Sequence, residues 1–454
     1  MTETTGAPSD ARRPGAQPSG PPPSVTARHA VTGRHPTPGR RTAAPLSCGS
    51  PGPTRRQVFR GLSASAVGVL AVGAAAGTGH AAPSRTPRDP RALDRAAVRR
   101  ELSTLIATQN LPGAQAVITD AAGRVTEIGA GAGDLDTGRP FPHRSRLRVG
   151  SNTKSFIATV VLQLVAAGRV VLDAPVERYL PGTLHGNGHD GRRISVRRLL
   201  QHTSGLPDFE QVVDVETPGH RRPEQVVART LLRYPPRFPP GARWEYCNLN
   251  YVLLGMLIER VTGHSYEHEV ERRVIRPLGL PHTYWPRWSE QRLHGPHPTP
   301  YRPTESGGHR EVTCVNTSGI GAAGALVSTG QDLTVFFTAL LSGALLPAAQ
   351  LAQLRATVPA DLARGAEYGL GVARYPLDPA AGGGWFWGHG GTLPGTRTRG
   401  GVGADGRAVL VAVNEAATGP DSAQAVTDTV GRIFRHVPRK AAVHRRLPTE
   451  GGSA

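Results

Sequence analysis

Strand-like segments fall into two groups that lie far apart in this 454-residue chain. The first group covers residues 114–119 and 124–130, and the second covers 369–374, 385–388, 396–402 and 407–414. Between them, at about residues 175–345, helical pieces alternate with proline and glycine. We therefore predict an α+β fold in which the N- and C-terminal segments close one antiparallel sheet, flanked by helices and carrying a mostly helical inserted domain.

Three longer helices are predicted outside this insertion. They cover about residues 91–110, 151–167 and 421–436. The first places Val98, Leu102 and Leu105 on one face, as a helix that packs on a core does. Strands and helices thus define a folded domain, which we assign to residues 82–438, and residues 439–454 form a basic tail.

The N-terminal part of the chain has the composition of a leader. Residues 1–53 are rich in Pro, Gly, Ser, Thr and Arg without apolar periodicity, which predicts disorder. Residues 54–81 combine Arg55 and Arg56 with a 16-residue apolar run and a small-residue stretch, and so resemble an export signal of the twin-arginine type. A buried helix or a weak membrane anchor is the alternative. We expect a secreted protein.

The formal net charge of the whole chain is +19. Such a charge favours an anionic neighbourhood, such as cell-wall polymer. We expect no nucleic-acid partner, because the basic residues are dispersed and no binding motif accompanies them. The sequence favours a monomer that needs neither a cofactor nor a metal ion.

Lysine is nearly absent, and one of the two lysines marks the candidate active site. Of 53 basic residues only Lys154 and Lys440 are lysines, and Lys440 lies in the basic tail. Lys154 follows Ser151 by three residues at the start of a predicted helix, so both side chains share one face. Arginine keeps its proton at any pH that a protein survives, whereas a buried lysine can lose it and act as a base.

Two further short motifs follow Ser151 and Lys154. Tyr246-Cys247-Asn248 offers a phenol that can relay a proton, and an amide that can bind both the lysine and a substrate carbonyl. His389-Gly390-Gly391-Thr392 offers glycines that let a substrate approach the backbone, and the N–H of Thr392 can join that of Ser151 in an oxyanion hole. Each motif alone is common by chance. Together and in this order they predict nucleophilic catalysis by Ser151.

With these motifs the chain resembles the serine β-lactamase-like superfamily, in the branch of class C β-lactamases and serine D-alanyl-D-alanine carboxypeptidases. The resemblance covers about residues 102–434 and includes the segments 172–176, 199–206, 277–280 and 321–329. It implies a β-lactamase/transpeptidase-like fold. It also implies that Ser151 is the acylated nucleophile, Lys154 its base partner, Tyr246 the proton relay to the leaving amine and Asn248 a contact to the substrate amide.

The third motif narrows the range of expected substrates. His389 stands where class C lactamases carry lysine and secreted carboxypeptidases of this branch carry histidine, which favours a peptidase. Histidine also occurs there in related esterases and D-amino-acid peptidases. Arg374 is a candidate for binding a substrate carboxylate, and a solvated arginine at a strand end is the alternative.

Two residues near the motifs are assigned structural roles. Cys247 stands where the family usually has serine, and a free, partly buried thiol is favoured over a pair with Cys314. His202, in His-Thr-Ser-Gly, is interpreted as a structural hydrogen-bonding residue and left out of the site.

The sequence therefore predicts an exported serine hydrolase that forms an acyl-enzyme. A D-alanyl-D-alanine carboxypeptidase acting on peptidoglycan stem peptides is the favoured activity. A β-lactamase or an esterase on the same fold is the first alternative, with a β-lactam or an ester as substrate. A penicillin-binding module without turnover is the second.

Overall fold

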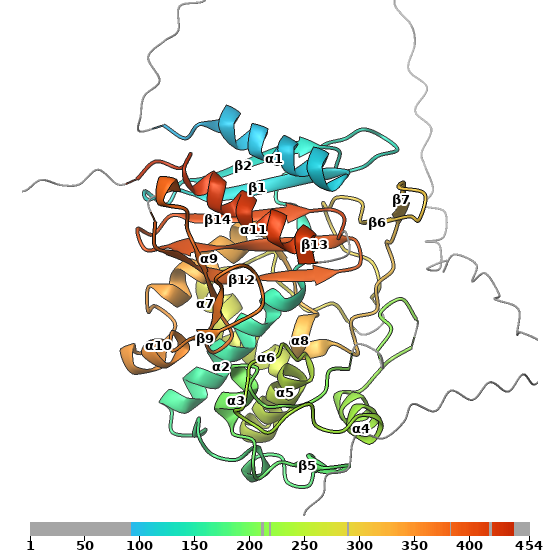
Figure 1. Ribbon diagram of the computed structural model, residues 1–454, viewed down its shortest axis with the longest axis vertical. Helices are drawn as coiled ribbons and strands as arrows, with labels where there is room; N and C mark the ends of the chain where they lie inside the picture. Colours follow the sequence, from blue (N-terminus) through green and yellow to red (C-terminus); the bar gives the residue numbers. More distant parts are fainter. Residues whose placement is uncertain are drawn as a thin grey trace, which may run out of the picture. The chain divides into compact units, whose positions relative to one another are not determined.

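The main sheet joins the two ends of the folded chain. This computed structural model describes residues 92–209, 213–217, 219–287, 290–381, 383–416 and 420–439. Eight antiparallel strands form the sheet in the order β2-β1-β14-β13-β12-β11-β10-β9 (Figure 1). The N-terminal strand β1 pairs with the last strand, β14, from Ala114 opposite Val413 to Thr119 opposite Ala408. The predicted antiparallel sheet, closed by the two ends of the chain, is confirmed.

The strands of the main sheet come from both ends of the described chain. Their bounds are β1 (Gly113–Thr119), β2 (Val125–Gly131), β9 (Val358–Pro359), β10 (Glu367–Tyr368), β11 (Ala373–Pro376), β12 (Trp385–Leu393), β13 (Thr396–Gly403) and β14 (Ala408–Val413). The remaining strands form three short pairs, β3 (Arg146–Arg148) with β8 (Val327–Thr329), β4 (His185–Gly186) with β5 (His189–Asp190), and β6 (Tyr301–Pro303) with β7 (His309–Glu311).

Helices cover both faces of the sheet. Helices α1 (Arg95–Gln109) and α11 (Pro420–Phe434) lie side by side on one face, and α9 (Gly330–Leu341) packs on the other (Figure 1). Strand β14 is buried along its whole length, with Val409, Val411 and Val413 in the core under α1 and α11 and the alternate residues facing the opposite core. Because strand side chains alternate between faces, this continuous apolar run fits a sheet covered on both sides.

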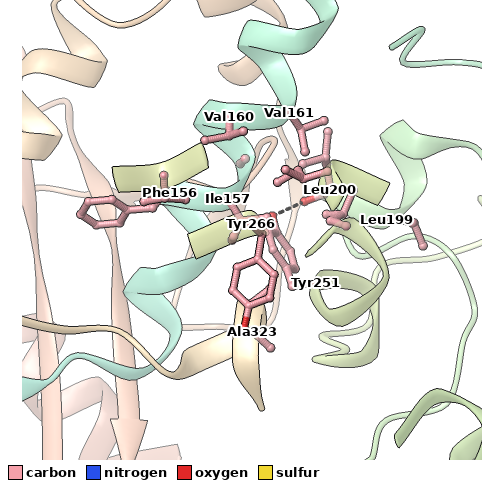
Figure 2. Close-up of a cluster of buried hydrophobic side chains, with 14 of the residues drawn as sticks. Phe156, Ile157, Val160, Val161, Leu199, Leu200, Tyr251, Tyr266 and Ala323 are labelled. Carbon is pink, nitrogen blue, oxygen red and sulfur yellow. Dashed lines mark hydrogen bonds between the residues drawn. The ribbon is translucent and has the colours of Figure 1, made fainter. Parts of the chain in front are cut away.

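The helical part of the molecule packs around a second hydrophobic core, distinct from the core under α1 and α11. It contains η1 (Gly150–Asn152), α2 (Thr153–Ala166), η2 (Val176–Arg178), α3 (Val196–Leu200), α4 (Pro223–Arg233), α5 (Leu249–Thr262), α6 (Tyr266–Val270), the π-helical turn η3 (Glu271–Ile275), α7 (Arg276–Leu278), α8 (Gly321–Gly324) and α10 (Ala348–Leu354). The short turn η4 (Pro379–Ala381) lies in the connection between β11 and β12, against α11. Helix α2 runs through the centre of the helical part and is almost completely buried (Figure 2). Phe156, Ile157, Val160 and Val161 of α2 pack there with Leu199 and Leu200 of α3, and Tyr251 of α5 donates a hydrogen bond to Leu200 O at 2.9 Å.

The structure differs from the sequence prediction in several places. Strand β12 continues to Leu393 instead of ending at residue 388, and so carries the third motif. Residues 369–372 form a turn between β10 and β11 rather than part of a strand, because Gly371 has a φ of 83° and bends the chain against α2. A Cβ at this position would lie 2.3 Å from the Cβ of Ala158. Within the predicted insertion of residues 175–345, α9 packs against β1, β13 and β14 rather than in the helical part.

The predicted leader and export signal lie outside the described residues, as does the basic tail apart from Arg439. Among the helices of the described ranges, none is long and apolar enough to cross a membrane.

The stacked pair Phe156 and Phe336 joins α2 to α9, with ring centroids 3.7 Å apart and both side chains fully buried. We expect Phe156→Ala to lower the free energy of unfolding by about 3–5 kcal/mol, because it leaves a cavity between the sheet-packed helix and the helical core. Denaturant unfolding measures this loss. The control Leu232→Ala, at a side chain on α4 that is 83% exposed, should change the free energy by less than about 0.5 kcal/mol. Equal effects in the two variants would contradict this packing.

Candidate active site

Ser151 lies in the short helical turn that precedes α2. The turn is fixed by its own polar groups: Thr153 Oγ1 donates to Gly150 O at 2.7 Å, and Asn152 Nδ2 donates to Val149 O at 2.7 Å and to Thr398 Oγ1 of β13 at 2.8 Å. These bonds tie the start of α2 to the sheet. Ser151 itself is only partly buried, so its hydroxyl can meet a substrate.

Lys154 is fully buried one helical turn after Ser151. Its Nζ lies 3.0 Å from Ser151 Oγ, 2.7 Å from Asn248 Oδ1 at the start of α5, and 2.7 Å from the carbonyl oxygen of Ala323 in α8. These three partners are uncharged groups from three separate elements. The predicted pairing of serine and lysine on one helical face is therefore present, and the predicted contact between Asn248 and the lysine is present too.

The Tyr246 phenol completes the group around the serine. It is hydrogen-bonded to the Ser151 side chain, and Lys154 Nζ lies 4.9 Å from the centroid of its ring. Burial raises the pKa of Tyr246 well above its usual value, although the bond to Ser151 acts in the opposite direction. The phenol therefore keeps its proton at neutral pH.

Strand β12 approaches the serine through glycine. A Cβ on Gly391 would lie 1.9 Å from Val149 O and 2.8 Å from Ser151 N, so any side chain here would push the strand off the serine turn. A Cβ on Gly150 would lie 2.9 Å from Thr392 N. The backbone nitrogen atoms of Ser151 and Thr392 thus belong to directly adjoining segments, as a two-donor oxyanion hole requires.

His389 is buried and uncharged. Its Nε2 lies 3.0 Å from the Tyr368 hydroxyl of β10, and its Nδ1 contacts the backbone of Gly390. Burial, together with the positive charges of Lys154 and Arg399, lowers the pKa of His389 to about 3, against the raising effect of its Gly390 hydrogen bond. His389 therefore gives the site a neutral imidazole and no cation at neutral pH.

These residues surround a pocket of about 350 Å³ that opens to solvent. Its polar lining residues include Ser151, Tyr246, Asn248, His389 and Thr392, and its apolar lining residues include Phe209, Val213, Val215, Ile320, Leu362 and Leu393. The candidate nucleophile thus faces a space that holds a small molecule or the end of a peptide.

The sequence profile of the beta-lactamase family matches residues 98–429. The chain belongs to the beta-lactamase family. Members of this family and the structural neighbours described next are serine hydrolases, and the chain is an enzyme of this kind. The resemblance inferred from the motifs and the β-lactamase/transpeptidase-like fold are both confirmed.

Solved structures of this family match most of the chain. A D-stereospecific amidohydrolase from Streptomyces sp. is 37% identical, with a TM-score of 0.66, over 74% of this chain and 97% of its own. The D-amino acid amidase from Ochrobactrum anthropi SV3, complexed with L-phenylalanine amide, is 27% identical, with a TM-score of 0.68, over 75% of this chain and 97% of its own. An octameric penicillin-binding protein homologue from Pyrococcus abyssi is 25% identical, with a TM-score of 0.62, over 74% of this chain and 76% of its own.

Curated relatives match over shorter stretches. Protein flp of Staphylococcus aureus (strain N315) is 28% identical over 41% of this chain, which spans 37% of that protein. Penicillin-binding protein 4 of Amycolatopsis lactamdurans is 32% identical over 41% of this chain, which spans 48% of that protein. The chain therefore matches less than half the length of these two relatives.

Within this beta-lactamase-family site, Arg374 does not line the pocket. Its guanidinium donates to both carboxylate oxygens of Glu367 at 2.7 Å and stacks on Trp385 at 4.2 Å from the ring centroid. A carboxylate already neutralises it, so the structure does not support the predicted contact between Arg374 and a substrate carboxylate.

Arg399 of β13 is the one arginine among the described residues that line the pocket. Its Nη1 donates to the Tyr375 hydroxyl, and its guanidinium carbon lies 4.8 Å from the centroid of the Tyr375 ring. A Cβ on Gly390 would lie 2.9 Å from Cζ of Arg399, so the glycine of the third motif gives the guanidinium room to reach the pocket.

Sequence reasoning missed several site residues. Arg399 was part of a predicted strand, but its reach depends on Gly390 of the neighbouring strand, which no local pattern reveals. The Ala323 carbonyl is a backbone group, although the segment 321–329 that contains it was noted for its resemblance. Asp208 accepts from Asn248 N at 2.9 Å and from Asn248 Nδ2 at 3.0 Å, and so fixes the amide. Cys247 is a free, buried thiol, as predicted.

We expect Gly391→Ala to abolish acylation of the protein while the helical core stays folded, because the added methyl group collides with Val149 O and Ser151 N. The rate of active-site labelling should fall by two orders of magnitude or more, about the cost of a 1 Å misplacement of reacting groups. Gly406→Ala is the control, since a Cβ there meets no atom within 4 Å, although its φ of 79° brings some strain. A Gly391→Ala protein labelled at the wild-type rate would contradict the close approach of β12.

Proposed function

We propose that this serine hydrolase is an exported D-alanyl-D-alanine carboxypeptidase that acts on peptidoglycan stem peptides through an acyl-enzyme at Ser151. The observation that carries the proposal is the meeting of Ser151 Oγ with Lys154 Nζ, at 3.0 Å, and with the Tyr246 phenol at the edge of an open pocket. Export by residues 54–81 belongs to the proposal, because the stem peptides of peptidoglycan lie outside the cytoplasmic membrane.

The proposed reaction uses these groups in sequence. Lys154, in its neutral form, takes the proton of Ser151, and Oγ attacks the carbonyl carbon of the scissile amide. The N–H groups of Ser151 and Thr392 stabilise the tetrahedral oxyanion. The proton held by Lys154 passes through the Tyr246 phenol to the leaving amine as the C–N bond breaks. Water then attacks the acyl carbon, and its proton returns to Ser151 Oγ as the acyl group leaves. Asn248 holds Lys154 in place and borders the substrate amide.

Two features of the pocket support a substrate that ends in a carboxylate. His389 is neutral, so the third motif supplies no charge of its own. Arg399 adds a guanidinium to the pocket, where its Nη1 donates a hydrogen bond to the Tyr375 hydroxyl. A planar guanidinium suits a carboxylate, because it donates two parallel hydrogen bonds.

An amidase for D-amino acids is the second candidate. The two structural relatives that support it, a D-stereospecific amidohydrolase and a D-amino acid amidase, match over 97% of their own length. Such an activity uses the same acyl-enzyme and differs in the leaving group, which is ammonia instead of an amino acid. The apolar wall of Phe209, Val213 and Ile320 suits an apolar acyl group of such a substrate.

We expect a fluorescent penicillin to label the wild-type protein covalently and Ser151→Ala to remain unlabelled. Lys154→Arg should reduce labelling by about two to four orders of magnitude, because it keeps the charge but cannot supply a neutral base. Lys440→Arg, which replaces the other lysine of the chain, is the matched control and should label normally. Mass spectrometry of the labelled peptide identifies the residue. Labelling that survives Ser151→Ala would refute this nucleophile, and an adduct that is never released would favour a binding module without turnover.

We expect Arg399→Gln to raise KM for a peptide ending in D-Ala-D-Ala by about 10- to 100-fold, the worth of a hydrogen bond between charged groups. The same variant should hydrolyse a D-amino acid amide, a cephalosporin and a short-chain ester nearly as well as the wild type does. Arg374→Gln, an arginine paired outside the pocket, is the control and should leave all four rates unchanged. A wild-type preference for the amide over the peptide would favour the amidase, and equal losses on all substrates in Arg399→Gln would remove the carboxylate assignment.

A further inference from the structure

His202 holds the backbone on both sides of Tyr246. Its carbonyl oxygen accepts a hydrogen bond from Glu245 N at 3.0 Å, and its ring Nδ1 accepts one from Cys247 N at 3.2 Å. Glu245 and Cys247 are the two chain neighbours of Tyr246. The histidine thus fixes the peptide units before and after the tyrosine, although it lies 44 residues earlier in the chain.

The ring of His202 also supports the phenol ring directly. The two ring centroids are 4.3 Å apart and the ring planes are tilted by 30°, so the rings are in close contact. Tyr251 and Tyr368 also pack against the imidazole, with ring centroids 5.3 and 4.9 Å away. Tyr368 in turn contacts His389, so the ring of His202 is linked to the third motif as well as to the second.

The hydrogen bonds decide the protonation of His202. Because a backbone N–H can only donate, Nδ1 must carry no proton and must accept from Cys247, and the same nitrogen lies 3.2 Å from Asn250 Nδ2. The single proton of the neutral ring is therefore on Nε2, which has no hydrogen-bond partner among the described residues. Burial and then the charge of Lys154 keep the pKa of His202 well below its usual value.

The backbone of His202 is held in an unfavourable conformation. Its φ is 61°, in the left-handed region that most residues other than glycine avoid. The side chain is fully buried and leaves a polar nitrogen unsatisfied, which also costs free energy. Costs of this kind persist where the surrounding structure demands them, and they cluster at functional sites.

We propose that His202 is a positioning residue for Tyr246: it clamps the backbone on both sides of the tyrosine and supports its ring, so that the phenol stays on Ser151 during acylation. This proposal rests on the proposed function, since it concerns the step in which Tyr246 moves a proton. It assigns His202 no contact with substrate. The clamp fails if the imidazole gains a second proton, because a proton on Nδ1 would face the N–H of Cys247.

Charged and titratable groups surround Tyr246 from every element packed against it. They are Ser151 and Lys154 of the serine turn and α2, His202 and Asp208 of the segment after α3, Cys247 beside it, Tyr251 of α5, Tyr368 of β10, Tyr375 of β11 and His389 of β12. Arg399 of β13 follows next, bonded to the Tyr375 hydroxyl. Burial among these groups is the main reason why the pKa of Tyr246 is high. Removing the ring that covers the phenol lets water approach and moves this pKa back toward its usual value.

The decisive variant is His202→Asn. Asparagine tolerates the left-handed backbone, and its side-chain oxygen can accept from Cys247 N in place of Nδ1, but it lacks the ring that supports the phenol. We expect the acylation rate, followed by stopped-flow labelling of Ser151, to fall about 10- to 100-fold with little change in KM. We also expect the alkaline limb of its pH profile to move to lower pH, because the phenol is less buried.

His189→Asn is the matched control. His189 is also a buried histidine with one bonded ring nitrogen, Nε2 to Tyr234 O at 2.8 Å, and one without a hydrogen-bond partner among the described residues, but it lies in β5, outside the pocket. This variant can lose stability, measured by thermal unfolding, yet it should keep the wild-type acylation rate and pH profile. A merely structural role for His202 predicts the same behaviour for His202→Asn.

A second substitution keeps the test decisive if His202→Asn does not fold. His202→Phe preserves a ring beneath Tyr246 but loses the acceptor for Cys247 N, and it too should lower the acylation rate of the folded fraction, counted by active-site titration. Wild-type acylation rates and pH limbs in a folded variant would overturn the positioning role. If the wild-type protein itself is not acylated at Ser151, the proposed function fails instead, so the two failures are distinguishable.

Discussion

One buried amine holds together the parts of the chain from which this site is built. Lys154 Nζ contacts the Ser151 hydroxyl in the turn that precedes its own helix, the Asn248 side chain at the start of α5 and the Ala323 carbonyl in α8, all within 3.0 Å. A buried ammonium without such partners would be costly, so α2, α5 and α8 must keep their mutual positions. The geometry of the serine therefore depends on the packing of the whole helical core.

The sheet supplies the other half of the constraint. Strand β12 lies against the serine turn at a distance that only glycine permits, and Asn152 bonds across to Thr398 of β13. Because β13 pairs with β14, and β14 with β1, the position of β12 depends on a sheet closed by both ends of the folded chain. The reactive group thus lies at the junction of two cores, where the sheet and the helical part each fix one side of the pocket.

The sequence was sufficient for the parts of the site that follow from local spacing. Ser151 and Lys154 lie one helical turn apart, and Tyr246 with Asn248 and His389 with Gly391 belong to short motifs whose order along the chain is informative. Most strands were located within a few residues of their ends. The turn at residues 369–372 was missed because Gly371 responds to α2, a contact distant in sequence.

Residues that act across elements could not be found in this way. Arg374 and Arg399 both belong to predicted strands on either side of the third motif, so the sequence alone does not distinguish them as candidates for binding a substrate carboxylate. They differ in whether a carboxylate of the protein lies beside the guanidinium. Glu367 lies opposite Arg374 in the register of β10 and β11, whereas Arg399 lies opposite Gly390, where no side chain blocks its path. His202 was correctly interpreted as a hydrogen-bonding residue, but its partner, the backbone around Tyr246, was visible only in three dimensions.

The distribution of charge explains why the site combines two neutral histidines with a single lysine. His202 and His389 are both buried, and the charge of Lys154 helps to hold the pKa of each below its usual value. A second cation at either position would disfavour the protonated form of Lys154, which the proposed reaction requires after proton transfer from Ser151. Apart from Lys440, the other basic residues of this chain among Lys and Arg are arginines, which cannot exchange protons with a nucleophile. In the proposed reaction the two cations therefore have different tasks: the Arg399 guanidinium binds the substrate carboxylate, and the Lys154 amine exchanges a proton with Ser151.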